Sequence, residues 1–275
     1  MDIISFEKRY VVPLGQPKQF NIVLVGVVGT GANLALILGR LAYAAGQQGI
    51  TVRLTFIDPD IVEQGNIGRQ PFCPAELGMN KATSMAQRLN LAYGLSITAV
   101  PDFFQPSMKA LHPLRAHAHQ QWRMATLVIG CVDNHLARRE LNNFAQLCEG
   151  SAWFLDCGNA YSNGQVLIGN LPAGSKIEVN PLGMCSGLPL PYVQEPALLV
   201  PDPIKAPQQS CALLAARGEQ SLIVNAQVAA VAGQRVHEFI FAREVRQMAA
   251  TFNLSPMVMR ATPITDATLA PYQPN

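Results

Sequence analysis

The stretch NIVLVGVVGTG at residues 21–31 decides the fold. It opens with a short, β-branched apolar run that ends in glycine, which is typical of a buried parallel strand. The turn that follows carries Gly26, Gly29 and Gly31, and residues 32–45 then repeat apolar side chains at helical spacing. We therefore expect a strand, a glycine turn and a helix, with the backbone amides at the start of the helix able to bind phosphate.

Strand and helix patterns alternate through the rest of the first half of the chain. Expected strands cover 52–57, 96–100, 125–131 and 152–157, and expected helices cover 80–93 and 134–148. An Asn163-Gly164 turn then leads into the first antiparallel addition, at 165–169. This alternation predicts an α/β fold with a doubly wound, mostly parallel, Rossmann-like sheet and antiparallel C-terminal additions.

The expected organisation is a single domain over residues 1–275. Residues 18–170 would form the nucleotide-binding core. In the crossover segment, 171–218, proline recurs too often for a regular helix or a central strand, so we expect extended chain that crosses the surface. The remainder, 219–275, is expected to hold a long helix over 219–249 and an edge strand within 252–264.

Composition and charge exclude several classes of protein. Hydrophobic residues make up 49% of the 275 residues and charged residues 14%, which indicates a globular protein. A net charge of +2 without a polybasic run argues against a nucleic-acid partner. Four of the first nine residues are charged, where a signal peptide needs an apolar core, and glycines together with Arg40 interrupt the apolar stretch 22–45. We therefore expect neither a signal peptide nor a membrane partner. The expected location is the cytoplasm.

Four side chains suit nucleotide chemistry. Asp58 ends the second expected strand, where a carboxylate can accept ribose hydroxyls. Arg69 and Lys81 would place two cations beside the phosphates. Asp133 follows the fourth expected strand at the same edge of the sheet, where it could hold Mg²⁺ together with phosphate oxygens. Val28 stands where the dinucleotide fingerprint has its second glycine, which argues against an NAD(P)-dependent oxidoreductase without excluding it.

The order of these motifs resembles one family. A glycine turn is followed by Asp-x-Asp at 58–60, Asn-x-x-Arg-Gln at 66–70, Gly-x-x-Lys at 78–81 and Cys-x-Asp-Asn at 131–134. Each motif is weak alone, but five in this order resemble the ThiF/MoeB/HesA family, relatives of the ubiquitin-activating enzymes. The likeness covers about residues 20–170. Within the family the chain most resembles the ThiF proteins of bacterial, plasmid-borne PRTRC systems.

The resemblance implies a reaction. Family members use Mg·ATP to adenylate the C-terminal glycine carboxylate of a small ubiquitin-like β-grasp protein, and they form homodimers. By this likeness Asp58 would hold the ribose and Asp133 would organise Mg²⁺. The phosphates and the adenylation transition state would be held, beside the turn of Gly26, Gly29 and Gly31, by Asn66, Arg69, Gln70 and Lys81.

The cysteines are relevant to two questions: whether the activated carboxylate is passed to a thiol, and whether the protein holds a structural zinc ion. Six cysteines without a Cys-x-x-Cys pair predict neither a disulfide framework nor the structural zinc of MoeB and ThiF. Where family members pass the activated carboxylate to a thiol, the acceptor lies before the last long helix. Cys211 matches that place better than Cys185, and an ordinary cysteine remains the alternative for both.

Two further interpretations stay open. Arg138, Arg139 and Glu140 read as an exposed helix face, from which Arg138 could reach the nucleotide. The protein could also be an inactive scaffold that binds a nucleotide or a β-grasp partner without catalysis.

Overall fold

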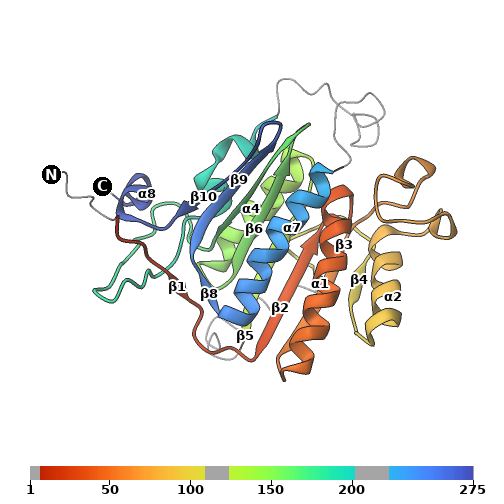
Figure 1. The fold of residues 1–275 in the computed structure, drawn as a ribbon, viewed down its shortest axis with the longest axis horizontal. Helices are drawn as coiled ribbons and strands as arrows, with labels where there is room; N and C mark the ends of the chain where they lie inside the picture. Colours follow the sequence, from red (N-terminus) through yellow and green to blue (C-terminus); the bar gives the residue numbers. More distant parts are fainter. Residues whose placement is uncertain (1–6, 109–123, 202–222, 275) are drawn as a thin grey trace.

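One eight-stranded sheet forms the centre of the protein in the computed structural model, which describes residues 7–108, 124–201 and 223–274 (Figure 1). The strand order is β10-β9-β7-β6-β5-β2-β3-β4. The strands are β2 (Gln19–Val25), β3 (Thr51–Ile57), β4 (Thr98–Val100), β5 (Met124–Gly130), β6 (Trp153–Asn159), β7 (Asn163–Gly169), β9 (Gln247–Leu254) and β10 (Met257–Pro263). Strands β6, β5, β2, β3 and β4 are parallel to one another, whereas β7 pairs antiparallel with β6 and β9, and β10 pairs antiparallel with β9. The predicted α/β fold with antiparallel additions is confirmed.

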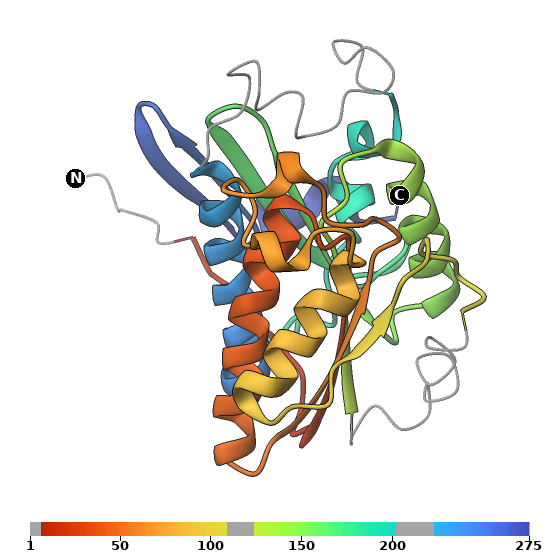
Figure 2. The ribbon, with the colours of Figure 1, turned by 90° about the vertical axis from the view of Figure 1, so that its right-hand side faces the viewer.

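Helices cover both faces of the sheet. The main helices are α1 (Gly29–Gln47), α2 (Lys81–Tyr93), α4 (His135–Cys148) and α7 (Val224–His237), and two single turns are α5 (Pro191–Gln194) and α8 (Asp266–Leu269). Helices α1, α2 and α7 lie on one face and α4 lies on the other (Figures 1 and 2). A separate two-stranded sheet pairs β1 (Val12–Pro13) with β8 (Glu244–Val245).

Strand β2 shows why the sheet is covered on both sides. Its side chains point alternately to opposite faces, as the pleat of a strand requires. Ile22 and Leu24 join the core under α1, α2 and α7, while Val23 and Val25 join the core under α4. An unbroken apolar run therefore suits this strand better than an alternating one.

The strand order reverses at β2, and this reversal positions the site. Strand β2 pairs with β3 on one side and with β5 on the other, both in parallel. The loops that follow the three strands therefore open at one edge of the sheet, where open α/β sheets bind ligands. Gly26, Asp58 and Asp133 lie in those loops.

The C-terminal part corrects one prediction. The long helix expected over 219–249 ends as α-helix at His237, and a π-helical turn, Glu238–Ala242, follows. The short strand β8 comes next, and β9 then pairs with β7 and β10. Ala249 and Ala250 have a local preference for helix, but pairing with a strand on each side outweighs it. The predicted edge strand is β10, and residues 219–222 lie outside the described part.

The proline-rich crossover does not stay on the surface as expected, because its residues Leu188, Leu190 and Tyr192 are buried in the core. Over residues 171–201 it holds only the turn of α5 and a 3₁₀ turn at Pro196–Leu199.

None of the helices within 7–108, 124–201 and 223–274 has the length and apolar character that a membrane span needs.

Candidate functional site

The glycine turn after β2 is shaped by close backbone contacts. Gly26 has a φ of +88°, and a Cβ there would lie 2.7 Å from the carbonyl oxygen of Cys131. A Cβ on Gly31 would lie 1.8 Å from the carbonyl oxygen of Gly26. The amide of Gly26 donates to the carbonyl of Ile57 at 2.9 Å. The turn is therefore wedged between the ends of β3 and β5, and two of its glycines are required for steric reasons.

The start of α1 is suited to an anion. The helix has 19 residues, and its N-cap residue, Val28, makes no side-chain cap hydrogen bond. The first amide to bond within the helix is that of Ala32, which donates to the carbonyl of Val28 at 2.6 Å. No acidic side chain lies in the first turn. Amides without a partner inside the helix and the positive end of the helix dipole together favour a phosphate at this point.

Asp58 ties the glycine turn to the loop after β3. Its side chain is buried, with Oδ2 accepting from the amide of Val27 at 2.5 Å and Oδ1 accepting from the amide of Asp60 at 2.8 Å. Burial raises the pKa of Asp58, and the two amide hydrogen bonds oppose that rise. The carboxylate thus fixes the glycine turn to the loop after β3.

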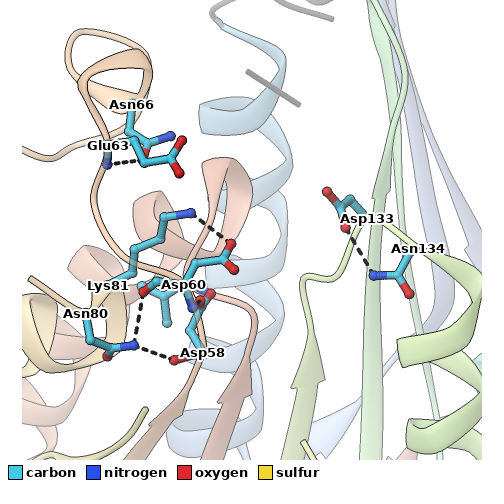
Figure 3. Close-up of polar contacts among 9 residues, drawn as sticks. Asp58, Asp60, Glu63, Asn66, Asn80, Lys81, Asp133 and Asn134 are labelled. Carbon is cyan, nitrogen blue, oxygen red and sulfur yellow. Dashed lines mark hydrogen bonds and ion pairs between the residues drawn. The ribbon is translucent and has the colours of Figure 1, made fainter. Parts of the chain in front are cut away.

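Lys81 is a fixed cation at the same edge. It is the first residue of α2 and is buried, with Nζ 3.0 Å from Oδ2 of the half-exposed carboxylate of Asp60 (Figure 3). The preceding Asn80 caps the helix by accepting from the amide of Thr83 at 2.9 Å. The same side chain donates to the carbonyls of Asp58 at 2.8 Å and Asp60 at 3.0 Å. The ion pair with Asp60 and the hydrogen bonds of Asn80 therefore fix the position of the Lys81 ammonium group.

Residues 63–70 form an ordered loop beside Lys81. Asn66 is buried, and its Oδ1 accepts from the amide of Glu63 at 2.8 Å. Its carbonyl accepts from the amides of Gln70 at 2.9 Å and Arg69 at 3.2 Å. Among the described residues, no partner reaches the buried Oε1 of Gln70. The structure thus brings the predicted Asn66, Arg69 and Gln70 into one loop, while Asn66 itself serves partly to fold that loop.

Asp133 lies on a different loop of the same edge (Figure 3). It is exposed, and its Oδ1 accepts from Nδ2 of Asn134 at 3.3 Å. Asn134 also caps α4 by accepting from the amide of Ala137 at 2.8 Å. Across the described residues, no three His, Cys, Asp or Glu side chains gather into a metal site. A Mg²⁺ ion at Asp133 would therefore complete its coordination with phosphate oxygens and water, as this ion commonly does.

The two thiol candidates differ in what the structure says of them. Cys185 is buried, its Sγ donates to the carbonyl of Gly187 at 3.0 Å, and burial raises its pKa. A buried thiol with a raised pKa is a poor nucleophile. Cys211 lies outside the described residues, so its role stays a prediction.

The prediction that Arg138 lies on an exposed face of the helix is wrong. Its side chain is largely buried, and Nε donates to Oδ2 of Asp156 at 3.2 Å. The hydroxyl of Tyr192 donates to the same oxygen at 3.3 Å. Burial raises the pKa of the fully buried Asp156, and Arg138 opposes the rise. The sequence offered no sign of this pairing, because Asp156 lies within an otherwise apolar strand.

The hydrogen bonds of the Glu76 carboxylate connect α2 to the turn before it, and they make the stability of the protein depend on pH. Its Oε1 accepts from Oγ of Ser84 at 2.5 Å and its Oε2 from the amide of Cys73 at 2.7 Å. Burial alone would raise the pKa of Glu76, but these hydrogen bonds and Arg88 lower it overall. A lowered pKa gives stability that is present above the unfolded value, about 4.3, and lost as the pH falls through the folded value.

We expect the Glu76→Gln variant to lose less stability than the parent chain over that acidic range. Urea unfolding at stepped pH measures the difference in free energy between the two. Two curves that stay parallel from neutral to acidic pH would show that Glu76 has no such role.

About half of this chain is similar in sequence to parts of curated enzymes named ubiquitin-like modifier-activating enzyme 5. The ubiquitin-like modifier-activating enzyme 5 of Oryza sativa subsp. japonica is 31% identical over 148 residues, which are 50% of this chain and 31% of that enzyme. The enzyme of the same name from Aedes aegypti is 29% identical over 133 residues, which are 46% of this chain and 30% of that enzyme. The chain thus matches less than a third of the length of these relatives.

Solved structures share the fold. E. coli MccB with ATP superposes with a TM-score of 0.55 at 15% identity, over 89% of this chain and 64% of MccB. PaaA superposes with a TM-score of 0.55 at 19% identity, over 90% of this chain and 65% of PaaA. The model of the ThiF family matches residues 15–268, so the chain belongs to the ThiF family.

Proposed function

We propose that this protein uses ATP to adenylate the C-terminal glycine carboxylate of a small ubiquitin-like β-grasp protein, with release of pyrophosphate. The observation that carries the proposal is that one edge of the sheet holds both the uncapped start of α1 and the buried ammonium group of Lys81, which is ion-paired with Asp60. Membership of the ThiF family and the similarity to ubiquitin-like modifier-activating enzymes support a reaction that activates a carboxylate with ATP.

The parts of the site would divide the work. The turn of Gly26, Gly29 and Gly31 would cradle the phosphates, with Asp58 at the ribose. Further donors to the phosphates would be Asn66, Arg69, Gln70 and Lys81. Asp133 would hold Mg²⁺, which supplies charge neutralisation when bound.

The chemistry needs positioned cations and no protein nucleophile. A carboxylate oxygen of the partner attacks the α-phosphorus of ATP, and the bond from that phosphorus to the bridging oxygen breaks. The electron pair leaves with pyrophosphate, so negative charge grows on the leaving group. Lys81 and Arg69 would stabilise that charge, and the preformed geometry lowers the cost of orienting the reactants.

A transfer to a thiol would follow at Cys211. Its thiolate would attack the carbonyl carbon of the acyl adenylate, forming a thioester as AMP leaves. The burial and raised pKa of Cys185 favour Cys211 among the two candidates. We also propose a cytoplasmic homodimer of the PRTRC type, on the motif order alone.

Trapping with hydroxylamine tests the proposed reaction. The protein is incubated with Mg·ATP, hydroxylamine and a small β-grasp protein encoded beside its gene. Adenylation predicts AMP together with a hydroxamate at the partner's C-terminus, seen by mass spectrometry. A partner whose terminal carboxylate is amidated serves as the control and should give neither product.

Other outcomes point to the two alternatives. ATP binding without AMP formation would favour a scaffold. Tight binding of NADH without binding of ATP would favour an oxidoreductase, against the expectation from Val28.

A further inference from the structure

Three polar side chains join elements that are distant in sequence at the edge of the glycine turn. Oδ1 of Asn225 accepts from Oγ1 of Thr30 at 2.9 Å and from Nδ2 of Asn159 at 2.5 Å. Nδ2 of Asn159 also lies 3.2 Å from Oγ1 of Thr30. Thr30 belongs to the first turn of α1, Asn159 ends β6, and Asn225 is the second residue of α7. The cluster thus ties the starts of two helices to the end of a strand.

The cluster sets the orientation of the Asn225 amide. Asn159 presents an amide nitrogen, which cannot accept a hydrogen bond, so Asn225 must present its oxygen to it. Its Nδ2 is thereby turned the other way. A Cβ built on Gly29 would lie 2.6 Å from that nitrogen, so Nδ2 sits against the first residue of α1. Gly29 therefore leaves room for Asn225.

The donors of Nδ2 are not used within the protein as described. Among residues 7–108, 124–201 and 223–274, the hydrogen bonds of the Asn225 side chain all end on Oδ1. The side chain is half-buried. Two N–H groups therefore lie beside the helix start at which a phosphate would bind.

The packing of α7 against α1 also favours an anion beside Asn225. Helices α1 and α7 lie side by side (Figure 1), and Gly29 faces Asn225 while Ile37, two turns later, faces Gly233. The two helices therefore run in the same direction. A Cβ on Gly233 would lie 2.7 Å from Cγ2 of Ile37, so the helices are closely packed. Both positive dipole ends meet at the edge where Asn225 lies.

We propose that Nδ2 of Asn225 donates a hydrogen bond to a phosphate oxygen of the nucleotide at the start of α1. Thr30 and Asn159 are positioning residues that hold the amide in this orientation. The inference rests on the proposed function to the extent that it requires a nucleotide at this turn.

An aspartate separates this role from a purely structural one. The side chain of an Asn225→Asp variant can still accept from Thr30 and Asn159, so the tie between the helices survives. A carboxylate at the start of a helix is also favourable for stability. It cannot donate, however, and its charge repels phosphate. A structural role predicts that the variant binds nucleotide normally, and a phosphate-binding role predicts that it does not.

The experiment compares ATP with adenosine by calorimetric titration. We expect Asn225→Asp to weaken ATP binding by about tenfold to a hundredfold, as for a lost hydrogen bond to a charged group, with adenosine binding unchanged. Asn225→Ala, which adds no charge, should show a smaller loss of the same selectivity. Asn159→Ser should weaken ATP selectively as well, because it frees the Asn225 amide. The exposed Asn143 on α4 provides the control Asn143→Asp, which makes the same change of charge and should bind ATP normally.

The outcomes separate this inference from the proposed function. ATP binding by both Asn225 variants at the level of the parent chain overturns the inference and leaves adenylation standing. An equal loss of ATP and adenosine also overturns it, because it indicates general damage to the site. A parent chain that binds no ATP overturns the proposed function, and the inference with it.

Discussion

The Gly31→Ala variant is expected to lose about 3 kcal/mol or more of its free energy of unfolding, and with it the binding of ATP. The new Cβ would lie 1.8 Å from the carbonyl oxygen of Gly26 and 3.1 Å from Cβ of Cys131. A backbone oxygen cannot move away as a flexible side chain can, so the turn between β2 and α1 must open. Urea unfolding measures the loss of stability, and titration with ATP measures the loss of the site.

Gly46→Ala is the matched control, because Gly46 belongs to the same helix. A Cβ there meets nothing within 4 Å, and the residue is exposed. Alanine should therefore stabilise the protein by about 0.5–1 kcal/mol and leave ATP binding intact. A Gly31→Ala variant as stable as the parent chain would contradict the packing of the turn described above.

The Lys81→Met variant is expected to lose pyrophosphate exchange by a factor of about 100 to 1000, the usual cost of removing one donor from a developing charge. Methionine keeps the apolar stem of the buried side chain and removes only the ammonium group. The carboxylate of Asp60 that it leaves is 55% exposed, so water can solvate it and the fold should persist. Exchange of labelled pyrophosphate into ATP measures the effect.

Lys176→Met is the control for this change. Lys176 is also paired with a carboxylate, that of Glu178, but its side chain is 74% exposed and it lies in the crossover segment. Its loss should leave exchange unchanged. Comparable rates for Lys81→Met and the parent chain would remove Lys81 from the mechanism.

The fold could be predicted where local patterns and tertiary structure agree. The run before Gly26 is apolar because both faces of β2 are covered, so strand and burial are visible together in the sequence. Asp58, Lys81 and Asp133 could be selected because each follows a strand or begins a helix at the edge where parallel strands open. The structure places all three at that edge.

Other features depend on contacts between distant segments. Strand β9 falls partly within the expected helix, and its pairing with β7 and β10 makes it a strand. The bond between Arg138 and Asp156 and the cluster around Asn225 join residues from different elements. Neither leaves a periodic pattern in the sequence. The structure was needed to find the residue that we propose as a further phosphate donor.

Mg²⁺-dependent exchange between ATP and pyrophosphate is the most direct test of the central claim. The assay is run with and without a small β-grasp protein encoded beside this gene, and with that partner amidated at its C-terminus. Adenylation predicts exchange that requires both the partner and its free terminal carboxylate. An absence of exchange with a protein that binds ATP and the partner would contradict it.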